Sequence, residues 1–399
     1  MVKQIKTEVE SFARIRVVGV GGSGGNAINH MVASNVVGVD FIAVNTDAQD
    51  LHKSKVKKKI HIGKSLTRGL GTGMNADVGK QAAEETREEI QEALKGSDMV
   101  FVTGGMGGGT GTGAAPVVAK VARELGALTV GVVTKPFAFE GAHRMRMAEL
   151  GIAELRKAVD AIIIIPNERL LAIVNRDTGV KNAFALCDDI LKQAVEGISD
   201  LITSTGIINV DFADVRTVMQ NAGSALMGIG LAMGEKRAEQ AARAAINSPL
   251  LEVSIHGAKG VLFSIAGSDD LGMLEIQDAA NVITEAIDPE AKVIFGAVTD
   301  ETLKKGQVRV TVIATGFPET NIKPGGPATP RLGARVDDEL PPLRIERKPE
   351  PPVRLREKEP TPPPPSVTSE PVKKVEIEKE TDIEDEDAWG GLPSFLRRK

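Results

Sequence analysis

The chain has 399 residues and a formal net charge of −5, which allows two or three folded domains and leaves no excess of basic residues. Domains that read nucleic acid usually cluster lysine and arginine on one face, whereas the one marked basic run, KSKVKKK at residues 53–59, is interpreted as a solvated loop. We therefore expect no nucleic-acid partner. The single cysteine, Cys187, excludes an intrachain disulfide, and no apolar run is long enough to cross a bilayer. We expect a cytoplasmic protein with no direct membrane insertion.

The first part of the chain is predicted to alternate short buried strands with helices. Its first strand, RIRVVGV at residues 14–20, is rich in β-branched residues and runs into glycines. Further strands are predicted at VDFIAVN, KIHIG, DMVFVTG, ALTVGVVT and VDAIIIIP, and helices at GNAINHMVASN, ADVGKQAAEETREEIQEALKG, APVVAKVARELG and HRMRMAELGIAELRKAV. This alternation predicts an α/β domain with a mainly parallel sheet over residues 14–180, after a flexible segment at 1–13.

A long helical pattern follows, too long for an ordinary crossover between strands. We predict a central helix at 181–204, then a loop with a following helix at 205–221. A second, smaller α/β domain is expected at 222–317. Its strands are predicted at SALMGIGLAMG, KGVLFSIAG, AKVIFGAV and QVRVTVIATG, and its helices at EKRAEQAARAAI and DLGMLEIQDAANVITEAI.

The composition changes near the end of the chain. Of the 21 prolines, 16 lie at or after Pro318, among many charged residues. Such a segment cannot bury enough apolar surface to offset the entropy lost on ordering. We therefore predict a disordered C-terminal tail, made of a linker at 318–388 and a terminal peptide at 389–399.

Two glycine-rich loops each follow a predicted strand and lead into a helix. They are GVGGSGGN at 19–26 and GGMGGGTGTG at 104–113, and the second has seven glycines in ten residues. Backbone N–H groups and a helix dipole at such a position attract anions, and glycine lets the backbone touch them. Two loops favour a nucleotide-binding domain whose ligand carries several phosphates. The alternative is tight packing of a helix against the sheet.

The spacing alone leaves the type of nucleotide open. Gly19, Gly21 and Gly24 satisfy G-x-G-x-x-G, which weakly indicates a dinucleotide-dependent oxidoreductase. The acidic residue expected about twenty positions later is not well placed. A phosphate loop of the Walker type is also absent, because Lys58 occupies the position of its leading glycine. Neither pattern explains the second glycine loop.

The run GGGTGTG at 107–113 resembles the signature loop that tubulin shares with the bacterial cell-division GTPases of the FtsZ family. The flanking sequence is similar to FtsZ rather than tubulin, over about 14–317 and again in the final LPSFLRRK. Further matching stretches are GVGGSGGNAINHM, AVNTDAQDL, GLGTGMNADVG, VTKPFAFEG and NVDFADVRTVM. The resemblance implies a GTPase that binds GTP and GDP with Mg²⁺ and polymerises head to tail at the mid-cell division site.

The resemblance also assigns roles to particular residues. It implies phosphate contacts by the two glycine loops, ribose-side contacts by an acidic and a basic residue, recognition of guanine by one aspartate, and catalysis by two others. These residues are, in that order, Gly22, Ser23, Gly24, Gly25, Asn26, Gly109, Thr110 and Gly111; Glu140 and Arg144; Asp188; and Asp211 and Asp214. Ser23 stands where the family often has another glycine.

Several of these residues have a simpler explanation on spacing alone. Glu140 and Arg144 can form an ordinary i,i+4 ion pair, and Asp211 can be a helix N-cap. Phe184, which the resemblance suggests stacks on the base, can equally belong to the core. Asp188 can be a solvated helix residue, and the neighbouring Asp189 carries the same charge.

The resemblance implies a site that two subunits complete. The loop with Asp211 and Asp214 is expected to enter the nucleotide site of the next subunit, so that hydrolysis follows assembly and favours disassembly. The terminal peptide is expected to bind membrane-tethering and regulatory division proteins. Mg²⁺ ligands stay unassigned, with Asp47 and Gln49 as possibilities. A scaffold that binds nucleotide without hydrolysing it is a further alternative.

Overall fold

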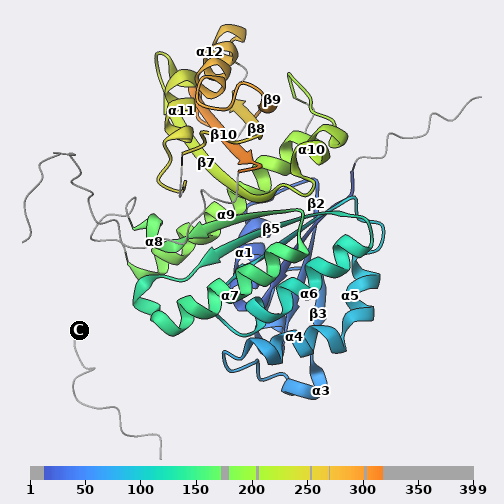
Figure 1. Ribbon diagram of the computed structural model, residues 1–399. Helices are drawn as coiled ribbons and strands as arrows, with labels where there is room; N and C mark the ends of the chain where they lie inside the picture. The colour runs from blue at the N-terminus through green and yellow to red at the C-terminus, as the bar shows by residue number, and fades with distance from the viewer. Residues whose placement is uncertain are drawn as a thin grey trace, which may run out of the picture. The chain divides into compact units, whose positions relative to one another are not determined.

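A computed structural model gives the fold of the chain (Figure 1). It describes residues 13–171, 179–203, 206–251, 254–268, 270–300 and 303–317. The predicted linker at 318–388, the terminal peptide at 389–399 and the N-terminal segment up to residue 12 lie outside the described residues. Among the helices that the structure describes, none combines the length and the apolar character needed to cross a membrane.

Ten strands form one sheet in the order β3-β2-β1-β4-β5-β6-β7-β10-β8-β9. Strands β1 to β6 all pair in parallel, which confirms the mainly parallel sheet predicted for the first part of the chain. The strands are β1 (Ile15–Val20), β2 (Val39–Asn45), β3 (Lys58–His61), β4 (Met99–Gly105), β5 (Leu128–Lys135), β6 (Ala161–Pro166), β7 (Gly223–Met233), β8 (Gly260–Gly267), β9 (Lys292–Thr299) and β10 (Gln307–Thr315).

Helices cover both faces of the parallel part of the sheet. Adjacent residues of β1 show how: Val17 belongs to the core on the side of α1 and α9, and Val18 to the core on the side of α4 to α7. The helical segments are α1 (Gly21–Ala33), α2 (Ala48–Lys53), α3 (Lys64–Thr67), α4 (Ala76–Glu85), α5 (Arg87–Leu94), α6 (Thr110–Glu124), η1 (Ala138–Glu140), α7 (Ala142–Ala158), α8 (Asn167–Leu170), α9 (Val180–Thr203), α10 (Phe212–Met219), α11 (Arg237–Ile246) and α12 (Met273–Thr284). Strands buried on both faces explain the continuous Val- and Ile-rich runs.

The single helix predicted over ADVGKQAAEETREEIQEALKG is wrong in one respect, because the structure divides it into α4 and α5. The break falls at Thr86, whose φ of −107° and ψ of 20° are not helical. Its hydroxyl donates to the carbonyl of Ala82 and accepts from the N–H of Gly63. A threonine that bonds its own preceding turn competes with the regular helical pattern.

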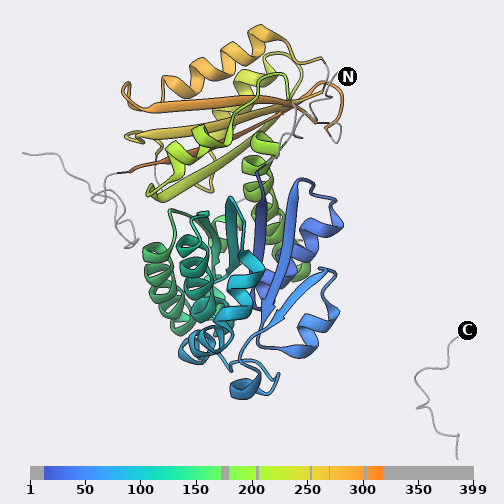
Figure 2. The same ribbon diagram turned by 90° about the vertical axis from the view of Figure 1, so that its right-hand side faces the viewer.

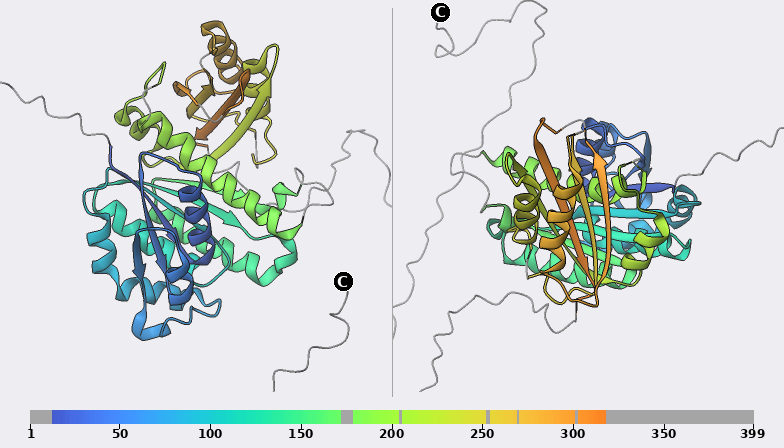
Figure 3. Two further views of the ribbon diagram at one scale, coloured as in Figure 1. Left: turned by 180° about the vertical axis from the view of Figure 1, so that it is seen from behind. Right: turned by 90° about the horizontal axis from the view of Figure 1, so that it is seen from above.

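Helix α9 is the predicted long central helix. Its 24 residues span about 36 Å at 1.5 Å per residue. It lies across the first sheet on the side of α1, as Figure 3 shows in the view from behind. It also contacts β8 and β9 of the second part of the chain.

The second part of the chain forms the smaller α/β unit expected from the sequence. β10 pairs antiparallel with β7 and β8, and β8 pairs in parallel with β9. Helices α11 and α12 cover one face of these strands (Figure 2). The sequence did not predict the connection between the two parts: three residue pairs join β6 to β7, so that one sheet runs through both. The residue boundaries proposed for the domains remain predictions.

Candidate functional site

Two helices begin at the same edge of the sheet without a side-chain cap. α1 starts directly after β1, and four residues separate the end of β4 from the start of α6. The GGSGGN segment therefore forms the first six residues of α1 rather than a loop before it. Because β1 and β4 are parallel neighbours, both helix N-termini lie together. The first-turn N–H groups of a helix have no partners within that helix, and the dipole there is positive. This edge of the sheet is suited to bind an anion.

A cavity of about 460 Å³ lies at this edge. It brings together most of the residues that the sequence singled out, from the glycine loops, η1, α7 and α9. Those lining it are Gly22, Ser23, Asn26, Gly109, Thr110, Gly111, Glu140, Arg144, Phe184 and Asp188. Four of the expected residues, Gly24, Gly25, Asp211 and Asp214, do not line it.

Gly24 has a packing role. A Cβ at this position would lie 2.6 Å from the carbonyl oxygen of Thr103 in β4, a distance that no real contact shows. The packing alternative given for the first loop therefore holds at Gly24. Gly25 faces Asp50 instead, and a Cβ there would make only an ordinary contact at 3.8 Å.

In the second loop, too, packing or backbone conformation requires some of the glycines and does not require another. A Cβ at Gly105 would crowd Ser23 and one at Gly111 would crowd the carbonyl of Gly105, while Gly107 has a φ of +101°. Gly108 differs from all of these. A Cβ there would meet nothing within 4 Å, its φ is not positive, and it lines the cavity. Neither packing nor a positive φ requires glycine at this position, so its backbone is open to close approach from the cavity.

The hydroxyl of Thr110 lies between two other hydroxyls. Its Oγ1 is 2.7 Å from Oγ1 of the fully buried Thr46 and 3.4 Å from Oγ1 of Thr72. Each hydroxyl has one hydrogen to donate and can accept two bonds, so Thr46 and Thr72 restrict how Thr110 can point at a ligand. Thr72 itself lines the cavity and was missed in the sequence, because a threonine in a glycine-rich loop gives no sign of where the loop folds.

Glu140 and Arg144 form the i,i+4 ion pair expected from spacing, and both also line the cavity. The distance between Arg144 Nη1 and Glu140 Oε2 is 2.8 Å. The other carboxylate oxygen of Glu140 accepts the N–H of Phe137 at 2.8 Å. The buried Arg144 Nε has no hydrogen-bond partner among the described residues. The two explanations given for this pair are therefore compatible.

Asp188 and Asp189 face different neighbours on α9. Asp188 lines the cavity, and burial raises the pKa of its carboxyl to about 6, against a smaller lowering by His30. Asp189 is 3.6 Å from Lys192 Nζ and accepts from Gln193 Nε2 at 2.5 Å. Charge alone could not decide between Asp188 and Asp189, and the structure shows that Asp188 is the carboxylate at the cavity.

Two neighbours of Asp188 complete this end of the cavity. Phe184 is 42% exposed and lines the cavity, so it is not a core residue, and its ring meets that of Phe137 edge-on at 5.4 Å. Cys187 is buried, and desolvation raises the pKa of its thiol to about 12. A thiol with so high a pKa stays protonated and unreactive at neutral pH.

Asn167 is a cavity residue that the sequence analysis missed. It is the first residue of α8, directly after β6, and it is 5% exposed. Its Oδ1 is buried and has no partner among the described residues, although buried polar atoms are normally hydrogen-bonded. A polar residue at the end of a predicted parallel strand was the available signal.

The two expected catalytic aspartates lie elsewhere. Asp211 is the N-cap of α10, where its side chain accepts the N–H of Asp214 at 2.9 Å, as the simpler explanation predicted. Both aspartates are exposed. Within α9, Thr203 lies about 22 Å beyond Asp188 at 1.5 Å per residue, and α10 follows that far end of the helix.

The described side chains do not form a cation site by themselves. No group of three or more His, Cys, Asp or Glu residues that could hold a metal ion occurs in the part of the chain that the structure describes. Asp47, one of the two possible Mg²⁺ ligands, caps α2 by accepting the N–H groups of Gln49 and Asp50. A metal ion at this site would therefore depend mainly on phosphate and water ligands.

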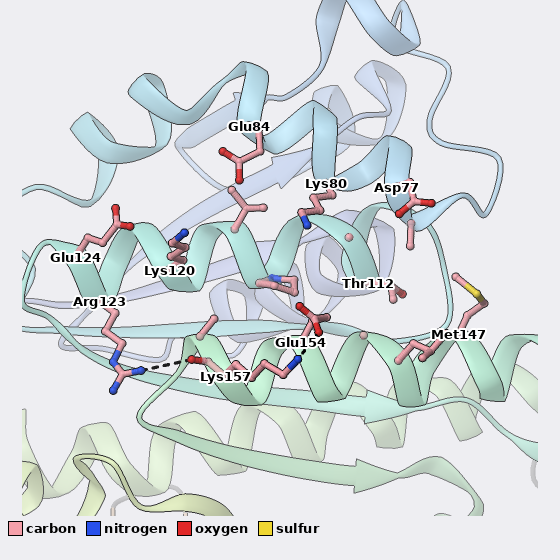
Figure 4. Close-up of a pocket in the computed structure, with 17 residues that line it drawn as sticks. Asp77, Lys80, Glu84, Thr112, Lys120, Arg123, Glu124, Met147, Glu154 and Lys157 are labelled. Carbon is pink, nitrogen blue, oxygen red and sulfur yellow. Dashed lines mark hydrogen bonds and ion pairs between the residues drawn. The ribbon is translucent and has the colours of Figure 1, made fainter.

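A larger groove of about 890 Å³ lies between α4, α6 and α7 (Figure 4). It is lined by apolar residues, among them Pro116 and Val117 of α6, and by charged residues, among them Lys80 of α4 and Glu154 of α7. None of the binding or catalytic residues expected from the sequence lines it. The smaller cavity at the helix N-termini is the candidate functional site.

An α/β domain that holds two uncapped helix N-termini and a partly buried carboxylate at one cavity has the features of a nucleotide-binding protein. Residues 14–175 match the GTPase domain of the Tubulin/FtsZ family, and residues 223–318 match the C-terminal domain of the FtsZ family. The chain belongs to the FtsZ family of tubulin-like GTPases. It accordingly binds GTP and GDP, and the oxidoreductase alternative is wrong.

Solved structures agree with this assignment. An empty FtsZ dimer from M. jannaschii is 48% identical, with 77% of this chain and 89% of that chain covered and a TM-score of 0.74. A CetZ protein of Haloferax volcanii, a GDP-bound monomer, is 24% identical. The match covers 77% of this chain and 95% of that chain, with a TM-score of 0.66. A second CetZ protein of Haloferax volcanii, in a GTPγS-bound protofilament, is 22% identical. The match covers 77% of this chain and 94% of that chain, with a TM-score of 0.63. At these lower identities the CetZ structures show a shared fold.

Proposed function

We propose that this GTPase polymerises head to tail into the filaments of the bacterial division ring and that the neighbouring subunit completes each active site. The observation that carries the proposal is the separation within one molecule: the cavity and the exposed carboxylates of Asp211 and Asp214 belong to opposite ends of α9. A contact that joins two different faces propagates into a filament. The similar FtsZ from M. jannaschii forms a dimer, which supports self-association.

Within one subunit, the cavity would bind GTP along its length. The N-termini of α1 and α6 hold the phosphates, and Gly22 and Gly108 offer backbone N–H groups with no side chain in the way. Glu140 and Arg144 lie beside the ribose. Asp188 accepts the N1 and N2 hydrogens of guanine, a donor pair that adenine lacks. Phe184 stacks on the base.

Hydrolysis needs a group that orients the attacking water, and no acidic side chain that lines the cavity lies free beside the glycine loops. Glu140 is already bonded to Arg144 and to Phe137, and Asp188 lies at the base end. Asp211 and Asp214 of the next subunit would supply this function by electrostatic positioning. Mg²⁺ bound to the phosphates would neutralise their charge. Loss of the γ-phosphate would then remove contacts at the interface and favour disassembly.

The remaining parts of the proposal rest on the sequence resemblance. The terminal peptide at 389–399 would bind membrane-tethering and regulatory division proteins at mid-cell, and the linker at 318–388 would give it reach. Both segments lie outside the described residues.

Mixing two inactive variants tests the shared site. Asp211→Asn leaves the cavity intact but removes the acid, and Gly108→Leu fills the cavity at a position where a side chain meets no protein atom. Each variant alone is expected to lose phosphate release. An equal mixture should recover about a quarter of the wild-type rate, because one contact in four joins an intact cavity to an intact acid in a head-to-tail polymer.

The control is wild-type protein mixed with Gly108→Leu, which shows how far that variant joins filaments. Full turnover by Asp211→Asn and Asp214→Asn would refute the catalytic role of the acids, and a mixture that stays inactive while the two variants co-sediment would refute completion by the neighbour. A GTPase rate per molecule that does not rise with protein concentration would refute both. Filaments that form without phosphate release in the wild type would indicate a non-hydrolysing scaffold.

A further inference from the structure

Residues 206–211 form the acid segment, which ends at Asp211 and is attached to the outer edge of the sheet. The N–H of Ile208 donates to the carbonyl oxygen of Ala297 in β9, and the N–H of Ala297 donates to the carbonyl oxygen of Ile208, both at 3.1 Å. β9 is the last strand in the sheet order, so this pair of bonds occupies an edge that no further strand covers among the described residues. Asp211 follows Ile208 by three positions.

Side chains hold the acid segment from both faces of the sheet. Ile208 packs against the core under α11 and α12, whereas Val210 is buried in the core on the side of α9. Asn209 Oδ1 accepts the N–H of Gly206 at 2.7 Å. The segment is therefore fixed up to the residue before Asp211, which in turn caps α10.

Gly206 lets the acid segment lie against β9. A Cβ at this position would come closer than 3.0 Å to the carbonyl oxygen of Ala297, which real Cβ atoms do not do. This oxygen is the one that accepts the N–H of Ile208. The φ of Gly206 is not positive, so packing is the reason for glycine here. An added methyl group would push the acid segment away from β9.

We propose that the pairing of Ile208 with Ala297 positions Asp211 for hydrolysis in the cavity of the next subunit, which makes Gly206 and Ile208 positioning residues for the reaction. This inference rests on the proposed role of Asp211. Misplacing a reacting group by about 1 Å can cost roughly a hundredfold in rate. None of the residues that line the cavity belongs to the second part of the chain, so that part would act on hydrolysis only through the acid segment.

Gly206→Ala tests the proposal. We expect phosphate release to fall roughly ten- to a hundredfold, while GTP affinity stays at the wild-type value because the cavity lies at the other end of α9. The matched control is Gly179→Ala, which adds the same methyl group where it meets nothing within 4 Å. This control should behave like the wild type in both measurements.

Mixtures show which half of the shared site has been damaged. Gly206→Ala mixed equally with Gly108→Leu should recover about a quarter of the wild-type rate, because one contact in four joins an intact cavity to a well-placed acid. Gly206→Ala mixed with Asp211→Asn should stay at the residual rate, because both variants are defective in the acid. A variant that was merely misfolded would recover in neither mixture.

Hydrogen exchange in the wild type tests the pairing without any variant. Lys292 donates its N–H toward β8, so the amides of Val293, Phe295 and Ala297 point to the outer edge of β9. We expect slow exchange at Ala297 and fast exchange at Val293 and Phe295 in unassembled, GDP-bound protein. An Ala297 amide that exchanges as fast as the other two would overturn the proposal.

Three results with Gly206→Ala would also overturn it: wild-type turnover, recovery with Asp211→Asn, or no recovery with Gly108→Leu. The mixture of Gly108→Leu with Asp211→Asn separates the two levels of argument. If that mixture stays inactive while the variants co-sediment, the proposed function fails. If it recovers and the mixture of Gly108→Leu with Gly206→Ala does not, only the positioning role fails.

Discussion

Asp188 is expected to cost the empty protein stability while it strengthens nucleotide binding. Burial raises the pKa of its carboxyl from 3.8 to about 6, so the folded state holds the ionised form less favourably than the unfolded chain does. A shift of this size corresponds to about 3 kcal/mol at 1.36 kcal/mol per unit. Because the side chain is partly exposed, solvent screening reduces the expected cost to about 1–2 kcal/mol.

The substitution Asp188→Asn removes the charge and keeps the shape. Without nucleotide at pH 7, we expect it to raise the melting temperature by about 2–4 °C. The sign follows from linkage: the cost is absent below the unfolded pKa of 3.8 and is complete only above the folded value of about 6. The gain should therefore shrink as the pH falls from 7 to 4. The same variant should bind GTP at least tenfold more weakly, and should prefer xanthosine triphosphate, whose base presents an acceptor where guanine has the 2-amino group.

Thermal melts of the nucleotide-free protein at pH 4, 5, 6 and 7, with a fluorescence titration of both nucleotides at pH 7, check this. Asn167→Ser, another substitution at a polar residue of the cavity, serves as the control that should not show the pH-dependent gain. An unchanged or lowered melting temperature at pH 7 would refute the argument that burial strains the charge. Unchanged GTP affinity would refute the contact with guanine.

The remaining predictions concern packing and reactivity. Gly24→Ala should destabilise the fold by about 3 kcal/mol or more, because the added Cβ would meet the backbone of Thr103. Gly108→Ala should leave the melting temperature unchanged and weaken GTP binding. Thermal melts and GTP titrations of both variants check this, and equal stability of the two would contradict it. Cys187 should resist alkylation by iodoacetamide at pH 8 in the folded protein, because burial raises the pKa of its thiol to about 12, and it should react fully in urea. Mass spectrometry measures the label, and fast labelling of the folded protein would contradict this prediction.

The sequence predicted most of the fold because its strands are short runs of β-branched residues that end in glycine or polar residues. Such runs, alternating with helical patterns, specify a parallel sheet with little ambiguity. The break between α4 and α5 escaped prediction because it depends on Thr86 bonding to Gly63, a residue far away in the sequence. The joining of β6 to β7 escaped it because strand order across two units is not encoded in local pattern.

The candidate site was predictable in part for similar reasons. Glycine loops at strand ends indicate an anion site, but only the structure shows that the packing requires glycine at position 24 and does not require it at position 108. Adjacent helix residues differ by about 100° in direction, so the sequence left Asp188 and Asp189 equivalent until α1 placed His30 against one of them. Thr72 became recognisable only when its loop met the cavity, whereas Asn167 directly follows a predicted strand and could have been found from that position.

The short pairing of β6 with β7 has a mechanical consequence. In the part of the chain that the structure describes, three residue pairs, beginning at Ala161 and Gly223, join the two halves of the sheet, while α9 and α10 each contact strands of both halves. Torsion between the halves would concentrate at this narrow seam, since few bonds there resist it. A load applied along a filament of such subunits would pass from one half to the other chiefly through the side chains of α9 and α10, because both helices contact strands of both halves.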